Sequence, residues 1–205
     1  MGHEVVELWH KDTDLQGVDF VVLPGGFSYG DYLRSGAIAK FSPIMESVIA
    51  HANNGGYVMG ICNGFQILTE SGLLEGALLH NNNQKFICKN VHLKAVSKTA
   101  APTIDLDASK AYKIPIAHGE GRFHADEATL ASLQANDQIL FTYCDESGAQ
   151  TPEANPNGSL LHIAGITNKT KNVFGMMPHP ERAADKQLNN IDGLRIFESI
   201  LAHCK

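Results

Sequence analysis

Short apolar runs alternate with amphipathic stretches along the chain, as in proteins where strands and helices alternate. Strands are expected over Glu4 to Trp9, Val18 to Leu23, Tyr57 to Ile61, Phe86 to Val96, Ala111 to Ala117, Gln138 to Tyr143, His162 to Thr167 and Val173 to Met177. Helices are expected over Ser42 to Ala52, from Asn63 to near Gly72 to Gly76, over Glu127 to Gln134 and over Ile191 to His203. No repeat, linker or change in composition divides the pattern. It predicts one α/β domain over residues 1–205 with a mixed sheet.

Local signals refine this pattern. The run Val18 to Leu23 is almost continuously apolar, which is typical of a strand buried on both faces and favours a parallel sheet. Ser42 is a suitable N-cap with Pro43 at the first helical position, and Gly55-Gly56 ends that helix. The stretch Asn168 to Asn172 resembles the loop of a hairpin between two antiparallel strands.

Composition and charge exclude several classes of protein. The chain has 205 residues, 43% of them hydrophobic, so it can bury a full core and is not intrinsically disordered. Its net charge of −6 gives no field that attracts phosphate backbones, and no segment is apolar for long enough to span a bilayer. We therefore expect a cytoplasmic protein with no nucleic-acid or membrane partner. The four cysteines form no Cys-x-x-Cys pair, which argues against a zinc site or a redox dithiol and favours free thiols.

The segment Tyr57-Val-Met-Gly-Ile-Cys62-Asn-Gly-Phe-Gln66 is typical of a nucleophile elbow. A strand ends at a cysteine flanked by two glycines, and a helix follows directly. A thiol at a helix N-terminus is close to unpaired amides that favour the thiolate, so we expect Cys62 to have a lowered pKa. The backbone amide of Asn63 is a candidate donor to an oxyanion. The same sequence also fits a structural turn around an inert buried cysteine.

Two further segments could complete a catalytic site. Gly175-Met-Met-Pro-His179-Pro-Glu181 holds a histidine between two prolines, so His179 could act as the base and Glu181 could orient it. The same residues also fit a surface His-x-Glu pair or half of a metal site. The glycine-rich stretch Leu23 to Asp31 follows a buried strand and could give a second oxyanion donor, but it lacks the spacing of a phosphate-binding loop.

Taken together, these segments resemble the class I, or triad, glutamine amidotransferases. That family shares a Pro-Gly-Gly loop, a Gly-x-Cys-x-Gly-x-Gln elbow and a His-x-Glu loop. Longer matches resemble the glutaminase subunits of phosphoribosylformylglycinamidine synthase in purine biosynthesis, over nearly the whole chain. They are Gly25-Gly-Phe-Ser-Tyr-Gly-Asp-Tyr-Leu-Arg34, Cys62-Asn-Gly-Phe-Gln-Ile-Leu68, Ala117-His-Gly-Glu-Gly-Arg-Phe123 and Gly175-Met-Met-Pro-His-Pro-Glu-Arg182.

This resemblance implies a fold, a reaction and partners. It implies a flavodoxin-like, mixed and mostly parallel sheet with flanking helices, and a glutaminase with the triad Cys62, His179 and Glu181. The amides of Gly26 and Asn63 would stabilise the oxyanion, and Gln66 would help to hold glutamine. The resemblance implies no metal or cofactor in this chain. ATP and Mg²⁺ belong to the partner synthetase subunit, and a small accessory subunit is also expected. The segment from His118 to Arg122 would lie near the pocket or the partner surface.

Two departures from the family pattern and two other functions stay open. Ser35 stands where many members have cysteine, and the chain starts at a segment that matches the family's second strand. Without the first strand and helix, we expect the chain to fold poorly or aggregate when it is expressed alone. Other interpretations are an elbow-cysteine hydrolase or glyoxalase of a related fold, and a noncatalytic regulatory subunit.

Overall fold

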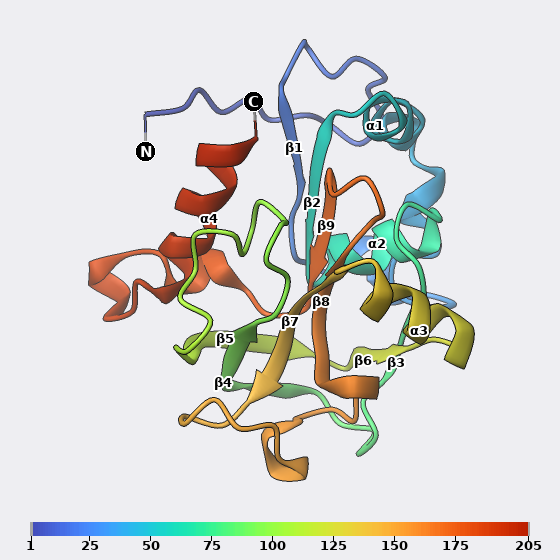
Figure 1. Ribbon diagram of the computed structural model, residues 1–205. Helices are drawn as coiled ribbons and strands as arrows, with labels where there is room; N and C mark the ends of the chain where they lie inside the picture. The colour runs from blue at the N-terminus through green and yellow to red at the C-terminus, as the bar shows by residue number, and fades with distance from the viewer. Residues whose placement is uncertain (1, 205) are drawn as a thin grey trace.

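The computed structural model describes residues 2–204, which fold around a mixed sheet of seven strands with helices on both faces (Figure 1). The strand order is β1-β2-β9-β8-β7-β4-β5. These strands are β1 (Phe20–Leu23), β2 (Tyr57–Ile61), β4 (Ile87–Ala95), β5 (Tyr112–His118), β7 (Ile139–Cys144), β8 (Ile163–Thr167) and β9 (Val173–Met176). Two more strands, β3 (Ala77–His80) and β6 (Glu120–His124), pair as a separate antiparallel ribbon.

Helices cover the β1-β2-β9 part of the sheet from two sides (Figure 1). The helices are α1 (Pro43–Asn53), α2 (Asn63–Glu70), α3 (Glu127–Ala135) and α4 (Asp192–His203). Short 3₁₀ helices are η1 (Ser28–Asp31), η2 (Ala39–Phe41), η3 (Pro152–Ala154), η4 (Leu160–His162), η5 (Pro180–Ala183) and η6 (Lys186–Leu188). In Figure 1, α1 and α2 lie on one side of these strands and α4 lies on the other. None of the helices described is long and apolar enough to cross a membrane.

Most of the expected elements are present. Apart from the first strand, each expected strand and helix forms with ends that differ by a residue or two, and α2 ends at Glu70, slightly earlier than expected. Ser42 occupies the N-cap position of α1, but its side chain makes no capping hydrogen bond and lies 3.2 Å from the hydroxyl of Tyr29. The loop from Asn168 to Asn172 joins β8 and β9 as an antiparallel hairpin. The ribbon of β3 and β6 was not expected, because β6 lies within the glycine-containing segment that follows His118.

The sheet is mixed, but the expectation that it is mostly parallel is wrong. Only the β1–β2 and β2–β9 pairs are parallel, and the other four pairs of the sheet are antiparallel. A parallel pair needs a long crossover, usually a helix, to bring the chain back across the sheet. No α-helix separates β4 from β5, β7 from β8 or β8 from β9, so these neighbours pair as antiparallel strands. The parallel strands carry the candidate site.

The start of the chain differs from the predicted pattern. Glu4 to Trp9 forms no strand, because no strand in residues 2–204 pairs with it, and the side chain of Val5 is exposed. An extended segment without a neighbour leaves its backbone groups to water, which removes the reason to form a strand. Among the described strands β1 pairs with β2 alone, so it is an edge strand. Val22 is 43% exposed, which contradicts burial on both faces.

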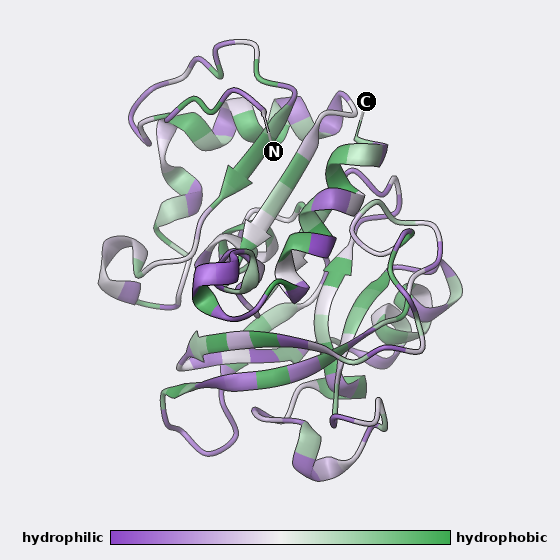
Figure 2. Cartoon of the chain, turned by 90° about the vertical axis from the view of Figure 1, so that its left-hand side faces the viewer, coloured by the Kyte–Doolittle hydropathy of each residue, from purple (hydrophilic) through white to green (hydrophobic). Residues whose placement is uncertain are grey.

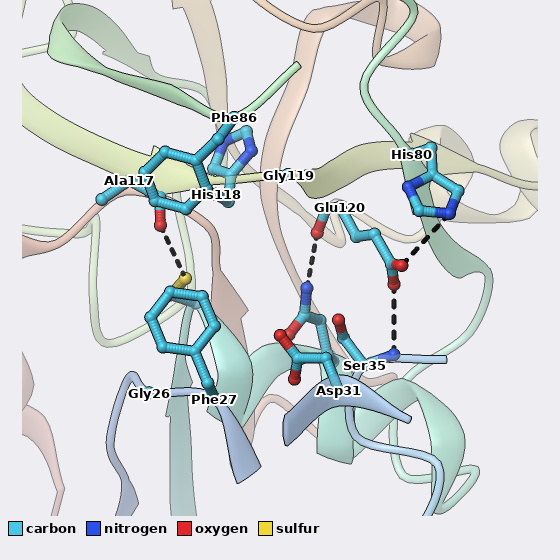
Figure 3. Close-up of a pocket in the computed structure, with 12 residues that line it drawn as sticks. Gly26, Phe27, Asp31, Ser35, His80, Phe86, Ala117, His118, Gly119 and Glu120 are labelled. Atoms are coloured by element: carbon cyan, nitrogen blue, oxygen red, sulfur yellow. Dashed lines mark hydrogen bonds and ion pairs between the residues drawn. The ribbon is translucent and has the colours of Figure 1, made fainter. Parts of the chain in front are cut away.

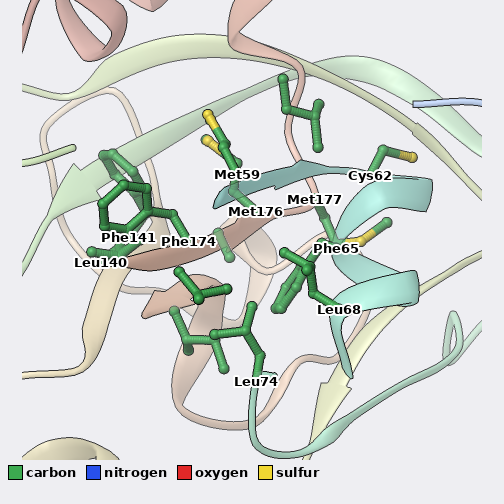
Figure 4. Packing of buried hydrophobic residues seen from close by; sticks show 14 of the residues in the cluster. Met59, Cys62, Phe65, Leu68, Leu74, Leu140, Phe141, Phe174, Met176 and Met177 are labelled. Atoms are coloured by element: carbon green, nitrogen blue, oxygen red, sulfur yellow. The ribbon is translucent and has the colours of Figure 1, made fainter. Parts of the chain in front are cut away.

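Helix α2 is anchored by one large apolar cluster (Figure 4). Phe65 is fully buried over β9, where the ring fills space that a side chain at Gly175 would need. Its ring also stacks on Phe123 of β6 at 6.5 Å between centroids. Burying one such side chain contributes about 1.5–3 kcal/mol to the free energy of folding. Figure 2 shows hydrophobic residues along the strands and on the helix next to the C-terminus. The contacts of Phe65 with β9 and β6 hold α2, which begins beside Cys62.

Candidate active site

Cys62 lies at a sharp turn between strand β2 and helix α2. Its backbone has φ 51° and ψ −105°, a combination that residues other than glycine rarely adopt. The amide of Cys62 donates to the carbonyl of Met176 in β9 at 2.8 Å, and α2 begins at the next residue. The sequence-based expectation of an elbow that lifts the thiol above the sheet is therefore confirmed in its backbone geometry.

Close contact between backbones explains the glycines on each side of Cys62. A Cβ atom at Gly60 would lie 2.5 Å from the carbonyl carbon of Gly64, and one at Gly64 would lie 2.0 Å from the carbonyl oxygen of Leu23. No side chain fits at such distances. The Gly-x-Cys-x-Gly spacing thus allows α2 to start close to the ends of β1 and β2.

His179 and Glu181 form a hydrogen-bonded pair on the loop after β9. The Nδ1 atom of His179 lies 2.6 Å from Oε1 of Glu181, so the carboxylate accepts from Nδ1–H and leaves Nε2 as the acceptor nitrogen. The imidazole is buried, and its Nε2 has no hydrogen-bond partner. The amide of His179 donates to the carbonyl of Pro115 at 2.8 Å, which fixes the loop against β5. This arrangement matches the expected base and orienting carboxylate.

Cys62 and His179 face the same small space. A Cβ atom built on Gly25 would lie 2.7 Å from Cε1 of His179 and 3.6 Å from Cβ of Cys62. Both side chains therefore lie next to the same position beside Gly25. The Sγ atom of Cys62 donates to the carbonyl of Ala117 at 3.7 Å (Figure 3), and it makes no hydrogen bond with Nε2 of His179. The candidate nucleophile and the candidate base are therefore neighbours, with the thiol directed toward the end of β5.

The expectation that Cys62 has a lowered pKa is wrong. Burial raises the pKa of the thiol to about 12, and the nearby carboxylate of Glu181 acts in the same direction. The hydrogen bond from the backbone amide of Asn63 opposes this effect without cancelling it. At a helix N-terminus the amide favours the thiolate, but removing the thiolate from water costs more here. At neutral pH Cys62 is a protonated thiol that needs a base.

The predicted oxyanion and substrate residues lie around this thiol. The backbone amide of Asn63 contacts the sulfur, and Gly26 lines a pocket of about 210 Å³ that also includes Cys62 and Gln66. The side chain of Gln66 is already paired: its Nε2 donates to the carbonyl of Glu120, and its Oε1 accepts from Asn63 at 2.9 Å. Gln66 thus links α2 to Glu120, which lines the pocket.

One wall of the pocket carries two acidic side chains, Asp31 and Glu120 (Figure 3). Glu120 accepts from the amide of Ser35 at 3.1 Å and lies 3.3 Å from Nε2 of His80. Asp31 has a buried oxygen, Oδ1, without a hydrogen-bond partner. Burial raises the pKa of Asp31, and the nearby charge of Glu120 raises it further. A hydrogen bond from Ser35 acts in the opposite direction and lowers this pKa. Two carboxylates therefore line one small cavity.

These acidic residues were not assigned a role from the sequence. Asp31 ends the glycine-rich segment, which was expected to give a backbone oxyanion donor. Glu120 lies in the segment from His118 to Arg122, which was expected near the pocket or the partner surface, so neither carboxylate had a predicted role of its own. Their sequence separation gives no sign that they face each other. Among residues 2–204, no group of three or more His, Cys, Asp or Glu side chains is arranged to hold a metal ion.

A family comparison matches most of the chain. Residues 3–199 match the model described as a CobB/CobQ-like glutamine amidotransferase domain. In Synechocystis sp., the phosphoribosylformylglycinamidine synthase subunit PurQ is 58% identical over 192 residues, which cover 94% of this chain and 86% of that protein. In Chlorobaculum parvum, the subunit of the same name is 54% identical over 202 residues, covering 98% of this chain and 80% of that protein.

Solved structures show the same similarity. The PurLQS structure from Thermotoga maritima contains a chain with a TM-score of 0.81 and 42% identity, and the match covers 95% of this chain and 84% of that chain. A glutamine amidotransferase from Thermotoga maritima gives a TM-score of 0.54 at 16% identity over 93% of this chain and 80% of that chain, which supports the fold alone.

Proposed function

This chain belongs to the CobB/CobQ-like glutamine amidotransferase family, and on that premise we propose that it hydrolyses glutamine at Cys62. It is the glutaminase subunit of phosphoribosylformylglycinamidine synthase, in which the ammonia serves the synthetase subunit that amidates formylglycinamide ribonucleotide. One observation carries the assignment of the site: a buried imidazole, oriented by Glu181, borders the same space as the thiol on the strained elbow.

Formation of the thioester begins with transfer of the Cys62 proton to Nε2 of His179. The sulfur attacks the side-chain carbonyl carbon of glutamine, and the carbonyl oxygen becomes an oxyanion close to the amides of Gly26 and Asn63. Because burial raises the pKa of Cys62 to about 12, proton transfer and attack have to be coupled. Glu181 stabilises the imidazolium that results.

Collapse of the tetrahedral intermediate releases ammonia. His179 returns its proton to the departing nitrogen, the C–N bond breaks, and a γ-glutamyl thioester stays on Cys62. Nε2 of His179 then removes a proton from water, which attacks the thioester carbon. The C–S bond breaks, glutamate leaves, and the sulfur recovers the proton from His179. No cofactor is needed for any of these steps.

The acidic wall suits the α-ammonium group of a free amino acid. Asp31 and Glu120 line the pocket that contains Cys62, and a cation beside them would offset the burial, and the repulsion from Glu120, that raise the pKa of Asp31. We expect Asp31→Asn to raise KM for glutamine by about tenfold or more, with a smaller effect on kcat, since hydrogen bonds to charged groups contribute about 1.5–3 kcal/mol.

Asp19→Asn is the matched control for that experiment. It removes the same charge from an exposed position before β1, at the opposite end of the strand from the glycine-rich loop. Its KM for glutamine should equal that of the unmodified chain. If Asp31→Asn also leaves KM unchanged, the α-ammonium group does not bind at the acidic wall.

An electrophilic glutamine analogue distinguishes the active-site thiol from the others. Cys88 is exposed, whereas Cys62 is buried with a raised pKa, so iodoacetamide should label Cys88 at least about 100-fold faster than Cys62 at pH 7. The analogue should reverse this order, because binding places its reactive carbon against Cys62 and His179. Peptide mapping after substoichiometric labelling gives the result, and equal labelling of all four cysteines would contradict the assignment.

Three further proposals concern cofactors, an accessory subunit and location. ATP and Mg²⁺ are proposed to bind the synthetase subunit, because the glutaminase steps derived above use neither. A small accessory subunit stays a proposal, supported by the assembly named PurLQS that contains the similar chain. The proposed location is the cytoplasm, where reducing conditions keep a nucleophilic thiol such as Cys62 available.

A further inference from the structure

Phe27 and Phe86 are two exposed aromatic side chains that the mechanism above does not use. Phe27 follows Gly26 in the glycine-rich loop, and Phe86 lies directly before β4. Both line the pocket that contains Cys62 (Figure 3), and their exposed fractions are 66% and 54%. Their ring centroids lie 6.2 Å apart, within the usual range for a contacting aromatic pair. The two rings therefore form one apolar surface on the lining of the pocket.

An apolar surface at this place matches the middle of a glutamine molecule. Two methylene groups separate the side-chain amide, which reacts at Cys62, from the α-carbon and its charged groups. With the amide at the thiol and the α-ammonium group beside Asp31 and Glu120, those methylenes cross the lining of the same pocket. Packing apolar groups of substrate and protein against each other removes both from water and stabilises the complex. Polar groups hold the two ends of the substrate, and the rings offer an apolar contact for its middle.

Asn81 holds the loop that carries Phe86. This loop joins β3 to β4, and the side chains from Asn82 to Phe86 are all exposed, so none of them packs in the core. Asn81 is fully buried, and its Nδ2 donates to the carbonyl of Lys85 at 2.8 Å, directly before Phe86. The backbone carbonyl of Asn81 accepts from the amide of Gln84 at 2.9 Å. The position of Phe86 at the pocket thus depends on Asn81.

The same residue fixes the loop to the end of β5. Nδ2 of Asn81 also donates to the carbonyl of His118 at 2.9 Å, and the backbone amide of Asn81 donates to the carbonyl of Gly119 at 2.8 Å. A Cβ atom on Gly119 would lie 4.0 Å from Cδ2 of Phe86, so the ring lies against this segment. Residues 117–120 line the pocket as well. Asn81 therefore joins the ring to the part of the wall that the thiol contacts.

We propose that the rings of Phe27 and Phe86 pack on the methylene groups of bound glutamine, and that Asn81 is a positioning residue that holds Phe86 in place for this contact. This inference rests on the proposed glutaminase function and adds a substrate contact to it. The contact stabilises the bound substrate and the transition state to the same extent, because the methylenes do not change during the reaction. Losing it therefore raises KM for glutamine and leaves kcat close to its original value.

Steady-state glutaminase assays of the complex with the synthetase subunit test the contact. Phe86→Ala should raise KM for glutamine by about fivefold, the order expected when two methylene groups lose an apolar neighbour, and change kcat by less than about twofold. Phe41→Ala is the matched control, because Phe41 is an exposed aromatic residue in η2 that does not line the pocket. It should leave both constants unchanged.

Two results for Phe86→Ala would overturn the proposal. One is an unchanged KM for glutamine. The other is loss of synthesis from added ammonia, which would show that the ring binds the synthetase subunit instead of the substrate. Because Phe86 is exposed, removing its ring leaves the core intact, so this variant gives a result even where a core variant fails to fold.

Asn81→Ala should raise KM for glutamine by the same factor, through the lost position of the loop. Asn81→Asp, which keeps the size of the side chain and removes both Nδ2 donors, should do the same. In the double variant of Asn81→Ala and Phe86→Ala, KM should stay within about twofold of the Phe86→Ala value, because a positioning residue has no effect once the residue that it positions is gone. Effects that multiply would show that Asn81 does not act through Phe86 and would overturn the proposal.

Asn172→Ala separates positioning from a loss of stability. Asn172 is a buried amide that also donates to two carbonyls, those of Ala52 and Gly56, both at 2.8 Å. It precedes β9, at the opposite end of that strand from the loop of His179. The variant should lower stability as Asn81→Ala does and leave KM unchanged, since unfolding reduces the amount of active enzyme and hence the apparent kcat alone. An equal rise of KM in both variants overturns the positioning role.

Hydrogen exchange tests the role of Asn81 without substrate. In the complex, mass spectrometry of Asn81→Ala should show exchange at least about tenfold faster in residues 82–86 and unchanged in β4, whereas Asn172→Ala should leave both unchanged. Unchanged exchange of residues 82–86 in Asn81→Ala overturns the inference. If the unmodified complex hydrolyses no glutamine, the proposed function fails and the substrate contact fails with it, while the exchange result still shows whether Asn81 holds the loop.

Discussion

Cys62→Ala is expected to reduce glutamine hydrolysis by at least about 10⁴-fold, because loss of the nucleophile in a catalytic triad has effects of that size or larger. The complex with the synthetase subunit should keep its synthesis from added ammonia, since this substitution removes only the source of ammonia. The two activities are measured on the same preparation, with glutamine or with an ammonium salt as the nitrogen donor.

Cys144→Ala is the control, because Cys144 is buried in β7 but does not line the pocket. It should retain both activities. Glutamine hydrolysis that survives in Cys62→Ala would show that another group is the nucleophile. Loss of the ammonia-dependent reaction as well would mean that Cys62 is needed for the synthetase step or for assembly.

His179→Ala is expected to lower kcat/KM for glutamine by about 10⁴-fold or more, whereas Glu181→Gln should lower it at least about tenfold less. His179 transfers the protons, and its ring is buried against the pocket. Glu181 orients the ring, and its side chain is 43% exposed, so water screens much of its charge. A glutamine at this position can still accept a hydrogen bond from Nδ1–H of His179.

Steady-state assays of the two variants in the assembled complex measure this difference. The ammonia-dependent rate serves as the control for folding and assembly. Equal losses in the two variants would show that the charge of Glu181 matters as much as the base, and a fully active His179→Ala would exclude His179 from proton transfer.

The geometry of the candidate catalytic segments was predictable from the sequence because it depends on residues that are close together in the chain. The strand, the glycine pair and the start of a helix lie within ten residues of Cys62, and Glu181 is two residues from His179. Residues that interact with near neighbours in the chain leave a recognisable sequence motif. Strands β2 and β9 also carry clear apolar runs, so both were predicted as strands, one directly before Cys62 and one directly before the loop of His179.

Features that depend on distant contacts were not predictable. The direction of the strands beyond β9, the β3–β6 ribbon and the acidic wall all depend on which segments meet in space. The protonated state of Cys62 was also not predictable, because it depends on residues that are distant in the sequence. The sequence shows a helix N-terminus, but only the three-dimensional packing shows that burial outweighs it. The contact between Nδ1 of His118 and Oδ1 of Asn81 likewise joins two distant parts of the chain.

Trapping the covalent intermediate tests the central claim most directly. The complex is mixed with glutamine carrying ¹³C in its side chain, quenched in acid during turnover, digested and mapped by mass spectrometry. We predict a labelled γ-glutamyl group on the peptide that contains Cys62, and its absence from the peptides of Cys88, Cys144 and Cys204. Formation of labelled glutamate without any adduct on Cys62 during turnover, or an adduct on another cysteine, would contradict the account.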